Sequence, residues 1–272
     1  MREHAITGGG GLRLHVQEAG NPGGRPLLFI HGWSQCRLAW MQQLNSDLAD
    51  DFRLVAIDMR GHGLSEKPHD AYGDSKLWAD DVHAVITELG LERPIISGWS
   101  YSGMLICDYL RVHGEAGVGG LHFVSAVSKL GTDAANAVVG PEFLNNAVAS
   151  FSTDAEEYVR AIEAYMAQVS VADLPPDVWY LILGYNAIVP PRVRQALFSC
   201  VIENDDLLPT ISVPTLITHG DSDQIVLPTA AEQHAALIPH AAHSVYPDIG
   251  HAPFAEAPDR FNQELHEFAS AA

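Results

Sequence analysis

Three short segments of the sequence carry the residue types of a nucleophile, an acid and a base. Ser100 is the middle residue of G-W-S-Y-S, Asp223 ends G-D-S-D, and His251 stands within I-G-H-A-P. A serine hydroxyl attacks a carbonyl group when a base removes its proton, and a carboxylate can orient that base. Residue types alone do not select these three from the other carboxylates and histidines, but brought together they could perform acyl transfer, with Ser100 as nucleophile, His251 as base and Asp223 as acid.

The residues around Ser100 are those of a sharp turn between a strand and a helix. An apolar run leads straight to the serine, and an amphipathic segment follows from Tyr101 to Val112. Side chains at such a junction collide with neighbouring elements unless they are small, and Gly98 and Ser102 are small. The start of a helix also favours an oxyanion. For the pentapeptide alone, a serine that only caps a helix is the alternative interpretation.

Asp221 competes with Asp223 for the role of the acid. Both residues follow an apolar run that ends at Thr218. The alternative role of Asp221 is to cap a turn, and we favour Asp223 as the partner of His251. The sequence contains 14 histidines, so His251 is selected by its place on a loop after a glycine and ahead of the last helix.

Short apolar runs alternate with amphipathic stretches, a pattern typical of βα units on a parallel sheet. An early edge strand is expected at Leu12–Gln17. Further strands are expected at 26–30, 53–57, 94–97, 121–126, 213–218 and 243–246, and helices at 75–89, 101–112 and 258–269.

This rhythm stops between residues 127 and 212. The segment has a helical pattern, no strong strand run and many aromatic residues. We expect it to be a helical cap inserted over the carboxyl edge of the sheet, with residues 1–126 and 213–272 as the core domain. Some of its aromatic side chains should face the cleft, although any one of them could instead belong to the core of the cap.

In this order the motifs resemble those of the α/β-hydrolase family. G-W-S-Y-S resembles its nucleophile elbow G-x-S-x-G, with Ser102 in place of the second glycine, and the segments at Asp223 and His251 resemble its acid and base motifs. His31-Gly32-Trp33 resembles its H-G-x motif. The resemblance implies an α/β fold, the α/β-hydrolase fold, in which a mostly parallel, doubly wound sheet carries an inserted helical cap.

The resemblance also implies a mechanism and a pocket. The backbone N–H groups of Trp33 and Tyr101 would hold the oxyanion, and a carboxylic ester or lactone would be cleaved through an acyl-enzyme on Ser100. We expect Trp33, Trp99 and Tyr101 to line the substrate pocket, where the Trp33 and Trp99 rings suit a small or flat acyl group. His31 is expected to shape its loop by hydrogen bonding, and no metal or organic cofactor is expected.

Three alternatives remain open. Cofactor-free haloperoxidases and perhydrolases resemble this chain around V-P-T-L and D-Q-I-V, but they usually have H-G-W-P where this chain has Ser34. Cofactor-free ring-cleaving dioxygenases of the same fold have their acid after the strand that follows the nucleophile helix, where this chain reads Ser125–Ser128. A non-enzymatic small-molecule receptor with the same fold is the alternative from another class.

Composition limits the partners and the environment. The sequence has 15 Lys and Arg against 34 Asp and Glu, a net charge of −19, which disfavours nucleic acid and anionic membranes and leaves a small-molecule substrate. Three cysteines are expected to be reduced and buried, and Asp80 and Asp81 to form a solvated helix face. With no signal peptide visible, a cytoplasmic location is expected. The sequence leaves the oligomeric state open.

Overall fold

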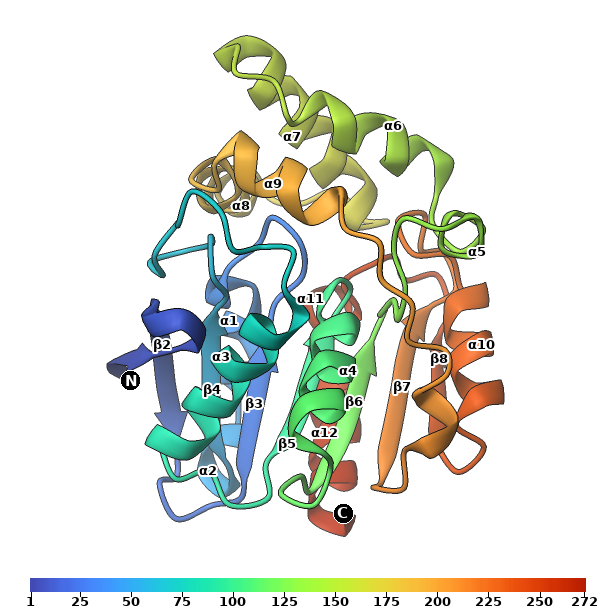
Figure 1. Ribbon diagram of the computed structural model, residues 1–272. Helices are drawn as coiled ribbons and strands as arrows, with labels where there is room; N and C mark the ends of the chain where they lie inside the picture. Colours follow the sequence, from blue (N-terminus) through green and yellow to red (C-terminus); the bar gives the residue numbers. More distant parts are fainter.

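Eight strands form one sheet in the computed structural model, which describes residues 1–272 (Figure 1). They are β1 (Arg2–Thr7), β2 (Arg13–Gly20), β3 (Pro26–Ile30), β4 (Arg53–Asp58), β5 (Ile95–Trp99), β6 (Gly120–Val124), β7 (Thr215–Gly220) and β8 (Ala242–Tyr246). The spatial order is β1-β2-β4-β3-β5-β6-β7-β8. The six strands from β3 to β8 are parallel, whereas β2 runs antiparallel to both of its neighbours. This confirms the mostly parallel sheet.

The expected edge strand at Leu12–Gln17 is not at the edge. Strand β2 covers this segment and lies between β1 and β4, so that β1 forms the edge. The alternation of apolar and polar residues over this segment is what suggested an edge strand, but β2 is paired on both sides, and its polar side chains Gln17 and Glu18 are buried. Glu18 accepts two hydrogen bonds from the guanidinium of Arg53 on β4, which satisfies its carboxylate away from water.

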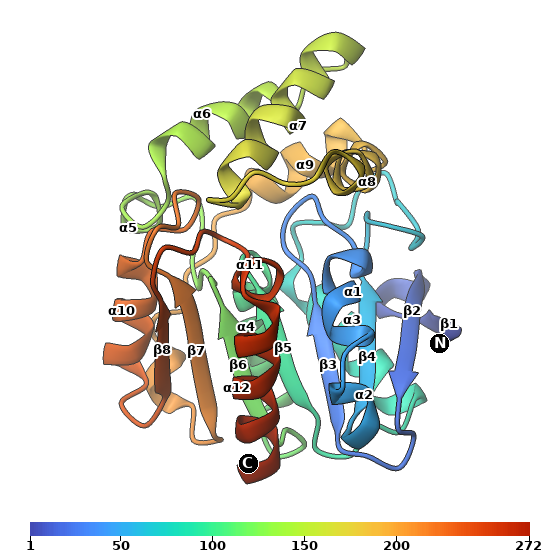
Figure 2. The same cartoon turned by 180° about the vertical axis from the view of Figure 1, so that it is seen from behind.

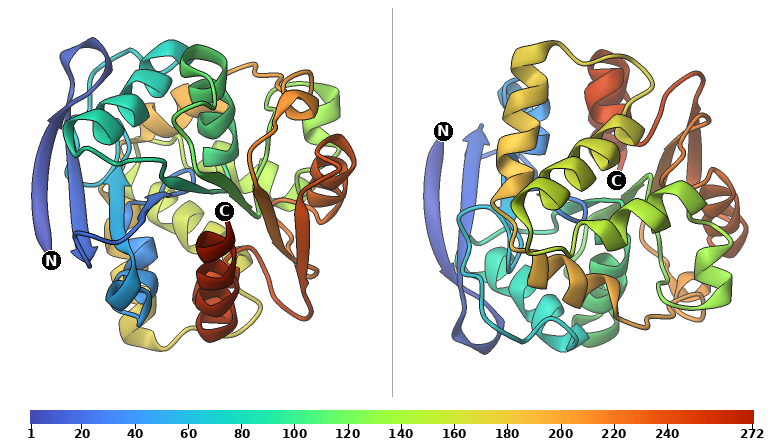
Figure 3. Two further views of the ribbon diagram at one scale, coloured as in Figure 1. Left: turned by 90° about the horizontal axis from the view of Figure 1, so that it is seen from below. Right: turned by 90° about the horizontal axis from the view of Figure 1, so that it is seen from above.

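Helices cover both faces of the sheet, as the turned views show (Figures 2 and 3). On one face lie α3 (Ser75–Glu88), α4 (Ser102–His113) and α10 (Thr229–Leu237), and on the other α1 (Met41–Leu44), α2 (Leu48–Asp51) and α12 (Pro258–Ala271), with α11 (Pro253–Glu256) beside it. Three short 3-10 turns complete the core: η1 (Gly9–Gly11), η2 (Arg37–Trp40) and η3 (Leu208–Thr210).

The alternation of side chains along β3 explains why the central strands read as unbroken apolar runs. Leu28 and Ile30 pack with the first group of helices, and Leu27 and Phe29 pack with the second. All four side chains are completely buried. A strand that is covered on both faces needs apolar residues at every position.

Five helices lie between β6 and β7, at the carboxyl ends of the parallel strands (Figure 1). They are α5 (Asp133–Asn136), α6 (Pro141–Ala149), α7 (Ala155–Val169), α8 (Pro176–Ala187) and α9 (Pro191–Phe198). Three of them begin with proline, whose fixed φ suits the first helical position. Helix α7 instead begins after Asp154, whose side chain accepts hydrogen bonds from two backbone N–H groups.

Two expectations about side chains in the core are wrong. Asp81 is 3% exposed rather than solvated, because its carboxylate forms a pair of hydrogen bonds with the buried guanidinium of Arg60, at 2.7 and 2.8 Å. All three cysteines are free, but only Cys36 and Cys107 are buried, while Cys200 is partly exposed.

No helix combines the length and the apolar character that a membrane crossing requires.

Candidate active site

Ser100 lies between β5 and α4 with a backbone angle φ of +57°. Residues other than glycine rarely adopt a positive φ, so contacts with neighbouring residues must hold Ser100 in this conformation. The Ser100 N–H donates to the carbonyl of Val124 at 2.9 Å, and the N–H of Val127 donates to the Ser100 carbonyl at 3.1 Å. The end of the neighbouring strand β6 thus fixes the turn on both sides of the serine.

Close packing explains the small residues around the turn. A Cβ at Gly98 would lie 2.8 Å from Ile106, and one at Gly103 would lie 2.5 Å from the carbonyl oxygen of Val127. Ser102 is tolerated because its hydroxyl donates to the carbonyl oxygen of His31. Ser102, which stands where the elbow motif has its second glycine, therefore joins the start of α4 to the loop after β3 by a hydrogen bond.

His251 and Asp223 are in direct contact. The Nδ1 of His251 lies 2.7 Å from Oδ2 of Asp223, and both side chains are buried. Since a carboxylate only accepts, Nδ1 carries the proton and Nε2 is left as the basic nitrogen. Nε2 is buried and has no hydrogen-bond partner within the protein. The indole N–H of Trp99 donates to the His251 carbonyl at 2.8 Å and supports its loop from β5.

The remaining contacts of Asp223 keep it ionised. Its Oδ1 accepts from the N–H groups of Ile225 and Val226 at 2.8 and 3.0 Å, and the Nε2 of His219 lies 3.2 Å from Oδ2. Burial alone would raise the pKa of Asp223, but the charge of His251 and the hydrogen bonds at Oδ2 outweigh it and hold the pKa at about 2.

Asp221 points elsewhere. Its carboxylate is exposed and accepts a hydrogen bond from the N–H of Asp248 at 2.8 Å, which ties together the loops after β7 and β8. Of the two candidate acids, Asp223 is the one that contacts His251.

The loop after β3 lies directly over the serine. A Cβ added to Gly32 would be 3.1 Å from the Cβ of Ser100, so a side chain here would press on the serine. The backbone N–H groups of Trp33 and Tyr101 have no acceptor within the protein. Both are therefore available to bind an oxygen atom from outside.

His31 shapes this loop, as expected. Its Nδ1 donates to the Gly32 carbonyl at 2.8 Å, and its Nε2 accepts from the N–H of Met59 at 3.1 Å. Burial lowers the pKa of His31 to about 4, although the charge of Asp58 acts in the opposite direction. With both ring nitrogens engaged, His31 has no free position from which to act as a base.

A narrow cavity reaches Ser100 between the sheet edge and the cap helices. It offers about 40 Å³ to a water-sized molecule, and twelve of the fourteen residues around it are hydrophobic. Trp33 and Tyr101 line it as expected, and Phe143 and Phe198 contribute from α6 and α9. The expectation that Trp99 lines the pocket is wrong: its ring is 2% exposed and packs on His251 and Phe254 at the opposite face of the sheet.

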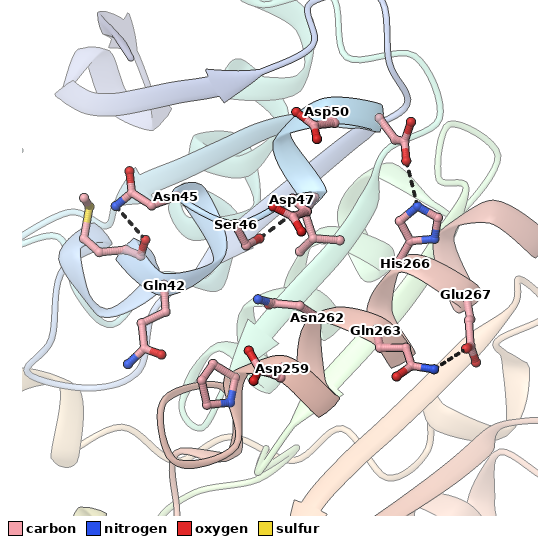
Figure 4. A pocket seen from close by; sticks show the side chains of 14 residues that line it. Gln42, Asn45, Ser46, Asp47, Asp50, Asp259, Asn262, Gln263, His266 and Glu267 are labelled. Atoms are coloured by element: carbon pink, nitrogen blue, oxygen red, sulfur yellow. Dashed lines mark hydrogen bonds and ion pairs between the residues drawn. The ribbon is translucent and has the colours of Figure 1, made fainter.

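A wider groove, lined mostly by polar residues, lies elsewhere on the molecule. It has a volume of about 890 Å³ and lies between α1, α2 and α12, where Asp47, Asp50 and Asp259 project from its walls (Figure 4). Ser100 lines the narrow cavity but not this groove, and only two of the fourteen residues around the groove are hydrophobic. We therefore place the chemistry at the narrow apolar cavity. No group of three or more His, Cys, Asp or Glu side chains is arranged to hold a metal ion.

Several buried polar residues that join the cap to the Trp33 loop were missed from the sequence. Asn186 accepts a hydrogen bond from the Ser34 hydroxyl at 2.8 Å, and the Tyr165 hydroxyl accepts one from Gln35 at 3.0 Å. The partners are more than 100 residues apart, and an isolated Asn or Tyr in a helix carries no local signal of such a contact.

Comparison with known proteins agrees with this architecture. Residues 25–258 match the family model described as alpha/beta hydrolase fold, and the chain belongs to that family. The structure is similar to the crystal structure of the esterase RhEst1 from Rhodococcus sp. ECU1013, with a TM-score of 0.92, 36% sequence identity and 99% of each chain covered.

Two curated relatives extend the comparison. The chain is 28% identical over 271 residues to the non-heme chloroperoxidase CPO-A1 of Kitasatospora aureofaciens, covering 95% of this chain and 96% of that protein. It is 27% identical over 256 residues to the pimeloyl-[acyl-carrier protein] methyl ester esterase of Vibrio atlanticus (strain LGP32), covering 90% and 95%.

Proposed function

We propose that this α/β-hydrolase is a serine esterase that cleaves carboxylic esters or lactones through an acyl-enzyme on Ser100. The observation that carries the proposal is the strained serine at φ +57° on the wall of an apolar cavity, in a protein where Nδ1 of His251 is bonded to Asp223 and Nε2 of His251 has no partner. The esterase names of RhEst1 and of the Vibrio relative support it.

In the proposed reaction, Nε2 of His251 takes the proton of the Ser100 hydroxyl as the oxygen attacks the substrate carbonyl. Asp223 stabilises the imidazolium that forms, and the N–H groups of Trp33 and Tyr101 hold the oxyanion. His251 then gives its proton to the leaving alcohol. A water molecule, deprotonated by His251, releases the acid and restores the serine.

The cavity indicates the class of substrate. Its apolar lining and small size favour a short, uncharged acyl group. We propose that residues 127–212 act as the cap that closes over it, since Phe143 and Phe198 contribute two of its walls. A long acyl chain would require the cap to move, so kcat/KM should fall as the acyl chain lengthens.

The test is a panel of p-nitrophenyl esters and lactones, combined with labelling by a fluorophosphonate. Wild-type protein should hydrolyse short esters and be labelled at Ser100, and Ser100→Ala should lose both properties. Ser125→Ala is the matched control, because the Ser125 hydroxyl is buried without a hydrogen-bond partner and its removal should cost little. Hydrolysis that survives in Ser100→Ala would contradict the acyl-enzyme on this serine.

Perhydrolysis is the second candidate, since one curated relative is named a non-heme chloroperoxidase. Ser34, which replaces the proline usual in such proteins, has φ +65°, an angle that the proline ring does not reach. The loop that carries Trp33 therefore differs from an H-G-W-P loop, and we expect ester hydrolysis to exceed peracid formation from acetate and peroxide. A halogenation assay with hydrogen peroxide measures the latter.

A further inference from the structure

Ser34 is strained and follows directly after Trp33, whose N–H we assign to the oxyanion hole. Its φ of +65° is in the left-handed region that favours glycine. The residue is completely buried. A non-glycine residue keeps such a conformation only where neighbouring contacts hold it, and strain of this kind gathers at functional sites.

Two hydrogen bonds from opposite sides hold Ser34. Its N–H donates to Nε2 of His62 at 3.3 Å on the core side, and its hydroxyl donates to Oδ1 of Asn186 at 2.8 Å on the cap side. His62 is a suitable acceptor because its Nδ1 donates to the carbonyl of Arg60. Burial lowers the pKa of His62 well below its usual value, so Nε2 remains unprotonated.

The cap holds Asn186 rigidly in place. Its side-chain NH2 donates to the carbonyl of Ile182 at 2.9 Å and to the side-chain oxygen of Gln35 at 3.4 Å, and its backbone carbonyl accepts from Arg194 at 2.6 Å. Arg194 is completely buried, and its guanidinium lies over the rings of Trp33 and Tyr158, with centroid distances of 5.5 and 5.1 Å. Helices α8 and α9 thus present a fixed acceptor to the loop.

We propose that the Ser34–Asn186 hydrogen bond is a latch through which the docked cap holds the Trp33 loop in its strained, catalytically competent conformation. The inference rests on the proposed esterase function. Ser34 and Asn186 are positioning residues: neither supplies a group to the reaction, and both act through the direction of the Trp33 N–H. The latch makes completion of the oxyanion hole depend on cap closure.

Three variants of the full chain test the latch in short-chain ester hydrolysis. Ser34→Ala and Asn186→Leu each remove the bond and should lower kcat about tenfold with little change in KM, since the loss falls on the transition state. Ser34→Gly removes the same hydroxyl, but glycine adopts φ +65° without strain, so its kcat should stay within about threefold of wild type.

A double variant and a control variant complete the test. The double variant Ser34→Ala/Asn186→Leu should be about as slow as Asn186→Leu alone, because the bond that Ser34→Ala removes is already lost in Asn186→Leu, which also loses the 3.4 Å bond to Gln35. Ser150→Ala is the matched control: its buried hydroxyl bonds only to the Ala147 carbonyl within the cap, so its loss should leave kcat near wild type.

The outcomes separate the latch from the proposed function. Equal kcat values for Ser34→Ala and Ser34→Gly, or a hundredfold loss in the double variant, would overturn the latch while wild-type hydrolysis stands. If wild-type hydrolysis did not depend on Ser100, the proposed function itself would fail. If Asn186→Leu does not fold, which thermal unfolding reveals, the Ala and Gly variants at position 34 still decide the question.

Discussion

Buried neutral histidines should make this protein sensitive to acid, and His122 on β6 isolates the effect. It is 1% exposed, and its ring nitrogens lie 3.3 Å from the Ser97 hydroxyl and 2.9 Å from the Thr218 hydroxyl. Burial lowers the pKa of His122 from 6.5 to about 3. The perturbation is His122→Gln, which removes the titrating group and keeps a polar side chain.

The sign and size follow from proton linkage. Because the pKa of His122 is lower in the folded state, the unfolded state binds more protons between pH 6.5 and 3, and stability falls as pH falls through this range. From pH 7.5 to pH 5, protonation of the unfolded histidine lowers the free energy of unfolding by about 2 kcal/mol. His31 and His234, whose pKa values burial lowers to about 4, act in the same direction.

Urea unfolding at pH 7.5 and pH 5, followed by tryptophan fluorescence, measures this difference. The free energy of unfolding of wild type should fall by about 2 kcal/mol more than that of His122→Gln. The cost of the substitution itself cancels, since each protein is compared only with itself. His69→Gln, at an exposed histidine, is the control and should follow wild type. Equal losses in wild type and His122→Gln would refute the reasoning.

Two further predictions concern a buried ion pair and the support of the base. Asp81→Asn breaks the buried ion pair with Arg60 and should lower the free energy of unfolding, measured by urea titration, by about 3–5 kcal/mol. Lys76→Ala breaks the exposed ion pair with Asp80 and is the control. It should change the free energy of unfolding by less than about 1 kcal/mol. Trp99→Phe removes the 2.8 Å bond to the His251 carbonyl and should lower kcat several-fold without unfolding the protein; unchanged kcat would show that this bond does not position the base.

The hydrophobic pattern of the sequence predicted correctly a strand that is buried on both faces. Strand β3 has the predicted bounds, because burial on both faces makes every residue apolar. Asp81 was misjudged although its place carried a signal: it lies three residues after Trp78 and four before Val85, on the buried stripe of α3. A carboxylate on that stripe implies a buried partner, and Arg60 is the partner.

Strand β1 was missed for a different reason. Its segment Arg2–Thr7 is mostly polar and exposed, as suits the edge of a sheet. What makes it a strand is its antiparallel pairing with β2, which only the fold supplies. The same absence of local signal applies to Trp99, whose place under His251 instead of in the pocket depends on which face of β5 each side chain takes.

The sequence by itself determined the order of the α/β units and the three residues proposed for the chemistry, because sharp turns and buried strands demand particular residue types at neighbouring positions. Only the tertiary structure decided what holds those residues: the contact of Asp223 rather than Asp221 with His251, and the bond from Asn186 to Ser34. Such contacts join segments far apart in the chain, and their energy depends on distance in space, which no local pattern encodes.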